Sequence, residues 1–417
     1  MRVWAYFVTV WPIFLVAAEN DPRRNPWKQD RFAISFWVDP MVPPERFDAE
    51  YQRVAEANFT VLLGGFGAKD PSTVTSQIAA ATKNGLKAIP NICNGKCANI
   101  SGAWGFQISD EPNVSQFNSV AKLVADAKAV GQMAFVNLLP NYATPKQLGA
   151  DTYEDYLLAY MKTVKPNMLS VDHYPAFDDP TRQPSNRTKK GYILNLLALR
   201  EVSLSVKPNI PFWNFFNAMP FNQVSQYDVS EAELRWQAYT SLAIGSKGVM
   251  YFCYWTPPGA GFLRGQAIMT PTPGNPPNIA DQSPGHKYPI VQRINSKLRV
   301  FGDWLLDTVS SSVVQTSGIA TTPLIQLPWT SINGSSAGPY SEFMLGCYDN
   351  NRTILLVNQD SNHPALATVG MAPRNEEMME VDPSSGKLVP PKDDSPFLPG
   401  FQIALLPGDG RLFTWTS

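Results

Sequence analysis

The sequence is poor in charge, histidine and cysteine. Charged residues make up 17% of 417 positions, the formal net charge is −1, and the chain has 3 histidines and 4 cysteines. It contains no basic run and no paired Cys/His spacing, which nucleic-acid binding and zinc ligation respectively require. We therefore expect no nucleic-acid partner, no metal and no organic cofactor. Hydrophobic residues reach 44%, enough for a large core, which excludes global disorder.

The first residues have the pattern of a signal peptide. Arg2 precedes an apolar run over residues 3–16, and small residues at Ala17 and Ala18 stand before Glu19. The run is shorter than the roughly 20 residues that a bilayer requires, although an uncleaved anchor is the alternative. No later segment is apolar enough to span a membrane. We expect a signal peptide over residues 1–18 and a secreted or secretory-lumen protein.

Modification sites follow from that expectation. Asn-X-Ser/Thr sequons occur at Asn58, Asn99, Asn113, Asn186, Asn333 and Asn351, and we expect glycosylation at Asn99, Asn186, Asn333 and Asn351. Asn58 starts a buried strand and is a poor site. Cys93 and Cys97 lie in one compact polar loop and are expected to form a disulfide. Cys253 is expected to be a buried free thiol.

Eight short apolar runs alternate with amphipathic stretches between Arg31 and Thr256, the pattern of parallel strands buried on both faces. They are residues 32–38, 59–65, 86–92, 104–109, 133–139, 168–174, 211–216 and 248–255. Eight strands alternating with helices predict an α/β fold, a (β/α)₈ TIM barrel. The alternative, a doubly wound open sheet, is weakened because no Gly-X-Gly-X-X-Gly follows the first strand.

The character of the chain changes after Thr256. A Pro- and Gly-rich stretch is expected to form a long loop over one barrel face, followed by a helix over residues 288–309. Short alternating strands then predict a small antiparallel β-sandwich. The expected domains are the barrel over residues 19–308 and the sandwich over residues 309–417.

The fourth run ends in Asp110 and Glu111, followed by Pro112. Active residues of a barrel lie where the strands end, and two adjacent carboxylates raise each other's pKa by repulsion. A carboxylic acid that stays protonated is what glycosidic cleavage needs, so Glu111 is the best candidate for a catalytic acid. The alternative is a helix start, where acidic residues are favourable.

The sixth run ends in Asp172, His173 and Tyr174. These side chains together suit the positioning of a sugar hydroxyl, the support of an acid or the supply of a base. A purely structural network beneath the loops is the alternative.

Aromatic and amide side chains at three further strand ends are candidates for sugar binding, because rings stack on sugars and amides bind hydroxyls. Core packing is the alternative for each. They are Trp37, Asp39, Trp213, Asn214, Asn217, Tyr254 and Trp255.

At these residues the segment from Arg31 to Thr256 resembles the large clan of retaining glycoside hydrolases that includes β-galactosidases and cellulases. The fourth strand in that clan ends in Asn-Glu-Pro with Glu as acid/base, and Asp110-Glu111-Pro112 is similar. The resemblance also implies that His173 and Tyr174 lie near the catalytic carboxylates and that Trp255 forms the floor of the sugar site. It implies a carbohydrate substrate.

The seventh run departs from that resemblance, because the clan's nucleophile is a Glu ending strand seven and residues 211–220 contain no acid. Three explanations compete. In the first, Asp172 supplies the second carboxylate, as base or nucleophile. In the second, the substrate supplies its own nucleophile, which resembles hexosaminidases that pair Asp with Glu on strand four. In the third, the barrel has lost hydrolysis and only binds glycan, or performs other chemistry.

Overall fold

The computed structural model describes residues 27–64, 70–92, 95–96, 100–176, 188–221, 227–259, 266–274, 278–316, 330–335, 342–350, 352–371, 377–397 and 401–416. These residues form two compact units. One comprises the described residues up to Val229 together with Ser246–Ser296, and the other comprises Ser230–Gly245 together with the described residues from Lys297 onward. The units differ from the predicted domains 19–308 and 309–417 in that two helical segments group with the C-terminal strands.

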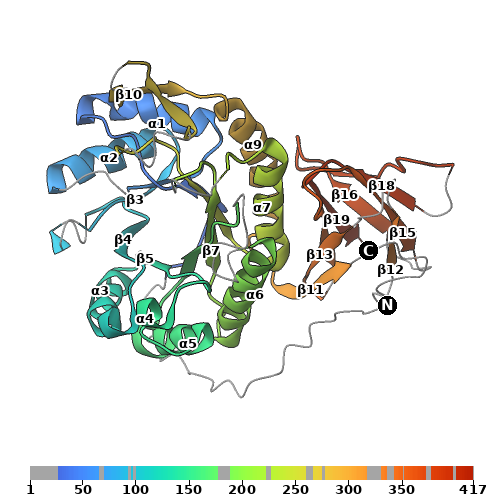
Figure 1. Ribbon diagram of the computed structural model, residues 1–417, viewed down its shortest axis with the longest axis horizontal. Helices are drawn as coiled ribbons and strands as arrows, with labels where there is room; N and C mark the ends of the chain where they lie inside the picture. Colours follow the sequence, from blue (N-terminus) through green and yellow to red (C-terminus); the bar gives the residue numbers. More distant parts are fainter. Residues whose placement is uncertain are drawn as a thin grey trace. The chain divides into compact units, whose positions relative to one another are not determined.

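A six-stranded parallel sheet is the centre of the first unit (Figure 1). Its strands are almost wholly buried, as the continuous apolar runs predict. In spatial order they are β1 (Ala33–Phe36), β8 (Gly248–Phe252), β7 (Phe212–Asn217), β6 (Leu169–Asp172), β5 (Met133–Leu138) and β4 (Gly105–Asp110).

The remaining two predicted strands, β2 (Val61–Leu63) and β3 (Lys87–Ile89), pair with each other in a separate parallel sheet. All eight predicted strands are thus present, six in one parallel sheet and two in the other. Thr60 joins the start of β2 to β1: its hydroxyl accepts from the Ile34 N–H at 2.8 Å and donates to the Phe32 carbonyl at 2.7 Å, and its own N–H donates to the Ile34 carbonyl at 2.9 Å. Both the side chain and the backbone of this threonine therefore bond to the first strand.

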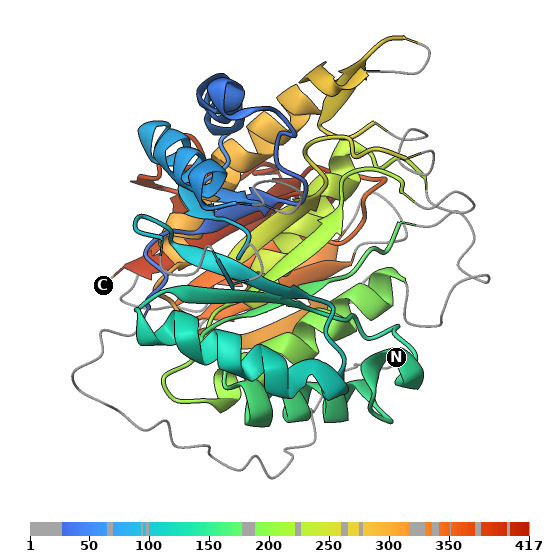
Figure 2. The same ribbon diagram turned by 90° about the vertical axis from the view of Figure 1, so that its left-hand side faces the viewer.

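Helices cover the outer side of these strands. In Figure 2 the blue helices α1 and α2 and the teal helix α3 lie on opposite sides of the strands. Local signals mark several helix boundaries: Asp70 caps α2, and Gly85 and Gly131 follow α2 and α3 with φ of 72° and 73°. The helices are α1 (Phe47–Glu56), α2 (Pro71–Lys83), α3 (Phe117–Ala129), α4 (Pro145–Leu148), α5 (Tyr153–Val164) and α6 (Lys189–Ser205).

The stretch after β8 is more regular than the expected long loop. It contains a hairpin of β9 (Met269–Thr272) and β10 (Asn278–Pro284), which Gln282 anchors. The buried Gln282 side chain accepts from the Thr256 N–H at 3.0 Å and donates to the Thr256 carbonyl at 2.8 Å. A buried amide satisfied on both sides fixes the hairpin in a way that the Pro- and Gly-rich composition does not predict.

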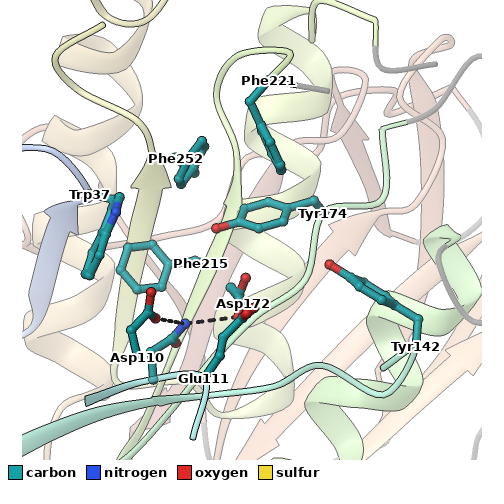
Figure 3. Close-up of a pocket in the computed structure, with 10 residues that line it drawn as sticks. Trp37, Asp110, Glu111, Tyr142, Asp172, Tyr174, Phe215, Phe221 and Phe252 are labelled. Carbon is teal, nitrogen blue, oxygen red and sulfur yellow. Dashed lines mark hydrogen bonds between the residues drawn. The ribbon is translucent and has the colours of Figure 1, made fainter. Parts of the chain in front are cut away.

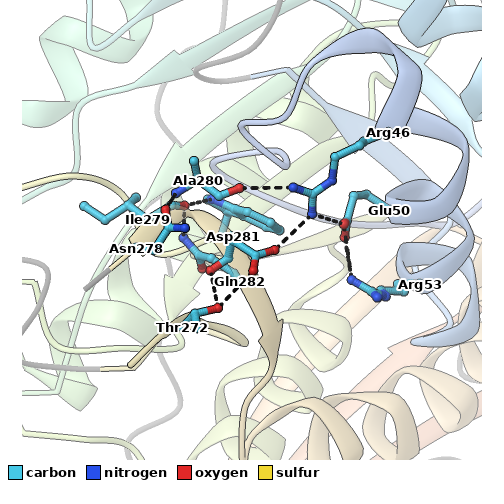
Figure 4. Close-up of polar contacts among 10 residues, drawn as sticks. Arg46, Glu50, Arg53, Thr272, Asn278, Ile279, Ala280, Asp281 and Gln282 are labelled. Atoms are coloured by element: carbon cyan, nitrogen blue, oxygen red, sulfur yellow. Dashed lines mark hydrogen bonds and ion pairs between the residues drawn. The ribbon is translucent and has the colours of Figure 1, made fainter. Parts of the chain in front are cut away.

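A group of ion pairs joins the same hairpin to α1 (Figure 4). Arg46 lies 2.9 Å from the buried carboxylate of Glu50 and 3.3 Å from Asp281 on β10. Arg53 approaches Glu50 from the other side at 3.1 Å. Glu50 therefore holds the two arginines, one of which reaches the hairpin.

The second unit contains two antiparallel sheets that share one core, in agreement with the predicted C-terminal antiparallel strands. Leu345, Ile354 and Phe413 of one sheet and Ala367 and Ile403 of the other belong to a single buried cluster. One sheet has the order β11 (Ser310–Thr316), β13 (Phe343–Tyr348), β14 (Thr353–Asn358), β19 (Gly410–Thr416), β16 (Glu377–Val381) and β17 (Leu388–Val389). The other has the order β12 (Thr330–Ser335), β15 (Ala365–Met371) and β18 (Phe401–Leu405).

Helix α7 (Glu231–Ile244) belongs to this second unit because of close packing on β13 and β14. Ser230 and Glu233 form a capping box at its start. Gly346 of β13 lies against Ala243, where any side chain would collide with the helix backbone, and the Tyr348 hydroxyl donates to the Leu242 carbonyl. The last part of α9 (Tyr288–Leu305) belongs to the same unit.

Cys253 and Cys347 are buried free thiols, which confirms the expectation for Cys253. Among the helices of the described ranges, none is long and apolar enough to cross a membrane. The segment 1–18, Cys93, Cys97, Asn99, Asn186 and Asn351 lie outside the described residues, and Asn333 is described only as part of the backbone of β12.

Candidate functional site

Three carboxylates meet at the carboxyl ends of β4 and β6 (Figure 3). Asp110 is the last residue of β4, Glu111 follows it, and Asp172 is the last residue of β6. All three line a pocket of about 270 Å³. The pocket thus brings together the three residues predicted to be catalytic, at the edge of the parallel sheet where such sites occur.

Asn137 of β5 joins the carboxylates from the strand between them. Its side-chain nitrogen donates to Asp172 Oδ1 at 2.9 Å and to Asp110 Oδ1 at 3.2 Å, so these two oxygens are no more than about 6 Å apart. The Ser170 hydroxyl donates to Asn137 Oδ1 at 2.9 Å. Because this oxygen is fixed as an acceptor, the amide group presents its two N–H donors to the carboxylates.

Backbone geometry directs Glu111 into the same pocket. Its φ of 47° lies in the left-handed region, which is unfavourable for a residue with a side chain. The Glu111 N–H donates to the Asn137 carbonyl at 2.8 Å, and the carbonyl of Pro112 accepts from the Tyr156 hydroxyl at 2.8 Å. These bonds to β5 and α5 hold the turn against its strain.

The electrostatic environment keeps protons on this group of acids. Burial raises the pKa of Asp172 well above its usual range, the charges of Glu111 and Asp110 raise it further, and the Asn137 hydrogen bond opposes them. Burial also raises the pKa of Asp110, again against the hydrogen bond from Asn137. The group therefore holds a proton at a pH where isolated carboxyl groups are ionised.

Aromatic side chains form the rest of the pocket lining. The Tyr174 ring meets Phe221 and Phe252 edge to face, with centroids 4.9 and 5.3 Å apart, and Trp37 meets Phe215 at 5.8 Å. Tyr142 completes the lining from the loop after β5. Flat apolar walls around a few polar groups suit the faces of a sugar ring.

Of the predicted substrate-binding residues, Trp37 and Tyr174 line this pocket. His173 lies directly behind it, fully buried, with its ring 5.0 Å from Tyr142 and 5.6 Å from Tyr192. The His173 ring packs against Tyr142 and is not part of the pocket lining.

Six other predicted residues are buried outside the lining, where they make structural contacts. Asp39 accepts from Gln77 at 2.7 Å, Asn214 donates to Tyr192, and Asn217 accepts from the Ala176 N–H. Trp213 stacks on Trp104, Tyr254 stacks on Phe36, and the Trp255 indole donates to the Ile279 carbonyl at 3.0 Å.

Five lining residues have no counterpart among the sequence candidates: Asn137, Tyr142, Phe215, Phe221 and Phe252. Asn137 could have been predicted from the sequence, because it is a polar residue near the end of a buried apolar run, as Asp110 is. Phe252 was missed because the apolar run continues to Trp255 whereas β8 ends at Phe252.

No group of three or more potential metal ligands occurs among His, Cys, Asp and Glu in the described part of the chain.

Comparison with known proteins gives a structural likeness only. No family model matches the chain, and no curated protein matches it in sequence. It is similar to a structure described as a glycoside hydrolase, at 10% identity and a TM-score of 0.48 over 93% of this chain and 92% of that one. It is also similar to a glycoside hydrolase family 5 structure from Bacteroides vulgatus, at 9% identity and 0.47 over 93% and 89%. A truncated 3-deoxy-D-arabino-heptulosonate 7-phosphate synthase from Thermotoga maritima matches at 12% and 0.39 over 66% and 88%. Likeness this distant, to proteins of different activities, assigns no activity.

Proposed function

We propose that this protein is a glycoside hydrolase that cleaves an oligo- or polysaccharide, with Glu111 as the general acid. The observation that carries the proposal is the group of three carboxylates around Asn137 in an aromatic-lined pocket. Glycosidic cleavage needs one carboxyl group that is protonated and one that is ionised, on either side of the bond. Aromatic walls hold the sugar ring between them.

Glu111 and Asp172 form the acid/base pair in this proposal. Glu111 transfers its proton to the glycosidic oxygen as the bond from that oxygen to the anomeric carbon breaks. Water attacks the anomeric carbon and its proton passes to Asp172. Because the charge of Glu111 is one cause of the raised pKa of Asp172, a protonated Glu111 favours the ionised Asp172 that the step requires.

A second mechanism for the same activity is supported by the position of Asp110. Asp110 lines the pocket next to Glu111 and is held by Asn137, so it is available to orient an N-acetyl group of the substrate. The N-acetyl oxygen would then attack the anomeric carbon, and Asp172 would have a supporting role. The non-enzymatic alternative is a pocket that binds glycan without hydrolysing it.

A glycan hydrolysis panel with the wild-type protein and Glu111→Gln tests the proposal. We expect release of reducing sugar by the wild type and its loss in the variant, with binding retained. If the wild type binds glycans but releases no sugar from any of them, the pocket is a binding site and the proposed hydrolysis is wrong.

Two structural expectations belong to the proposal. Residues from β1, β2, β3, β5, β7 and β8 share one interior cluster, which supports closure of the strands into an eight-stranded barrel. The segment 1–18 supports entry into the secretory pathway, consistent with an extracellular glycan as substrate. N-terminal sequencing of secreted material, with Glu19 as the expected first residue, tests the latter.

A further inference from the structure

The pocket lining consists mainly of aromatic and acidic side chains. Of its ten described residues, six are aromatic, three are carboxylic acids and one is an amide. None of these ten is Lys, Arg or His. Aromatic ring faces attract cations through the ring quadrupole, and carboxylates attract them through charge. The aromatic and acidic side chains of the lining therefore both favour a positively charged ligand.

Two of the acids have no positively charged side chain as a partner in the described part of the chain. Asp110 and Asp172 form no ion pair there, and their shared hydrogen-bond donor, Asn137, is neutral. Asp172 is 6% exposed, whereas Asp110 remains open to the pocket. A carboxylate without a counter-charge in a partly desolvated site is unfavourable, and a bound cation relieves it.

Tyr174 gives an independent indication of a ligand. It is 7% exposed, and its hydroxyl makes no hydrogen bond to any described residue. Figure 3 shows this hydroxyl directed into the pocket, toward the carboxylates. A hydroxyl in this position can donate to a bound molecule and accept from it, so its partner is expected to come from the ligand.

We propose that the sugar unit bound in this pocket carries a protonated amine, as a 2-amino-2-deoxyhexose does. The ammonium group would pair with Asp110 at the open end, and the ring would lie against the aromatic walls with a hydroxyl on Tyr174. That the ligand is a sugar rests on the proposed function, whereas its positive charge rests on the lining itself. Sugars with carboxylate or sulfate groups would be repelled by the acids. N-acetylation removes the positive charge and with it the preference.

Binding of four oligosaccharides of equal length tests the charge. Oligomers of glucosamine, N-acetylglucosamine, glucose and glucuronic acid are titrated calorimetrically into the wild type and Glu111→Gln in a mildly acidic buffer. We expect the glucosamine oligomer to bind at least about tenfold more tightly than the two neutral oligomers. The glucuronic acid oligomer is expected to bind most weakly. Equal or tighter binding of a neutral oligomer would overturn the inference, and preference for the N-acetyl form would favour the substrate-assisted mechanism.

Two charge-removing variants locate the effect. Asp110→Asn keeps the size of the side chain and is expected to reduce the preference for the amine by about tenfold. Asp126→Asn removes an equal charge from an exposed position of α3 and should leave the preference unchanged. If both variants change it equally, the preference reflects the overall charge of the protein and the assignment to this pocket is wrong.

The inference and the proposed hydrolysis fail separately. Amine-selective binding without release of sugar would retain the inference and refute hydrolysis. Equally efficient cleavage of neutral and amine-bearing oligomers would retain hydrolysis and refute the inference.

Discussion

The side-chain amide of Asn137 donates to the buried carboxylate of Asp172 at 2.9 Å, and the same nitrogen reaches Asp110 at 3.2 Å. One neutral donor therefore stabilises the ionised forms of two acids from different strands. Its orientation depends on Ser170, whose hydroxyl occupies the amide oxygen. In the proposed reaction Asn137 acts as a positioning residue, since it acts through the acids.

Replacing Asn137 should change the pH dependence of activity. The hydrogen bonds of Asn137 lower the pKa of Asp110 and of Asp172, so Asn137→Ala should raise both. The acidic limb of the kcat/KM profile should then move to higher pH, with a loss of about tenfold at its former optimum. Ser170→Ala should cause a smaller shift in the same direction, whereas Ser119→Ala on the exposed face of α3 should cause none. A loss of activity with no movement of the limb would show that Asn137 is only structural.

Asp172→Asn should stabilise the protein at higher pH. The folded-state pKa of Asp172 is raised by burial, so its stabilising contribution is complete below the usual pKa of aspartate and is lost as the pH rises through the raised value. Above that value the wild type carries an unfavourable buried charge that the variant lacks. We expect a gain on the order of 1–3 kcal/mol in the free energy of unfolding near neutral pH and little difference in acid. Urea denaturation of both proteins over a pH series measures it, and a difference independent of pH would contradict it.

The leaving group separates the roles of Glu111 and Asp172. Glu111→Gln should reduce cleavage of natural glycosides by about 10²–10⁴-fold and spare aryl glycosides whose leaving group departs without protonation. Asp172→Asn should abolish cleavage of both kinds, because it removes the base. Initial rates on a natural oligosaccharide and on its nitrophenyl glycoside measure both effects. Near-normal turnover by Asp172→Asn would instead favour the substrate-assisted mechanism with Asp110 as the orienting group.

The apolar runs predict where the parallel strands lie, since burial on both faces leaves a direct trace in the sequence. They also predict the pocket acids, because Asp110 and Asp172 end such runs. An apolar run does not show where strand pairing stops within it. The eighth run continues to Trp255, but β8 ends at Phe252, so Tyr254 and Trp255 lie beyond the strand end that they were predicted to form.

Long-range contacts account for the other differences. Tyr142 lies in the loop after β5, which is held by Asn141 through bonds to Asn195 and to the Gly191 carbonyl. Asn195 and Gly191 lie 54 and 50 positions further along the chain. A local sequence pattern therefore cannot predict these contacts. The contact between Thr60 and Ile34 of β1 likewise joins residues 26 positions apart.

Two tryptophans test which aromatic residues bind sugar. Trp37 lines the pocket, and Trp37→Ala should weaken sugar binding by about tenfold through loss of one stacking wall. Trp255 lies outside the lining with its indole on the Ile279 carbonyl, so Trp255→Phe should cost about 1 kcal/mol of stability and leave sugar affinity unchanged. Calorimetric titration and urea denaturation measure the two effects. Weaker sugar binding by Trp255→Phe would restore the role that the resemblance implied.

Glu50 provides a test of how the β9–β10 hairpin is held. Its carboxylate is 2% exposed and contacts Arg46 and Arg53, whose side chains are 37% and 42% exposed. Glu50→Gln would leave two arginines facing a neutral group and should destabilise the protein by about 1–3 kcal/mol, less than a fully buried pair because solvent screens the arginines. Asp281 is the other carboxylate that contacts Arg46, and its side chain is 55% exposed. Asp281→Asn should therefore cost at most about 0.5 kcal/mol of stability. Urea denaturation gives both values, and limited proteolysis shows whether the hairpin becomes accessible first. Equal costs for the two variants would mean that burial of Glu50 does not decide the strength of this contact.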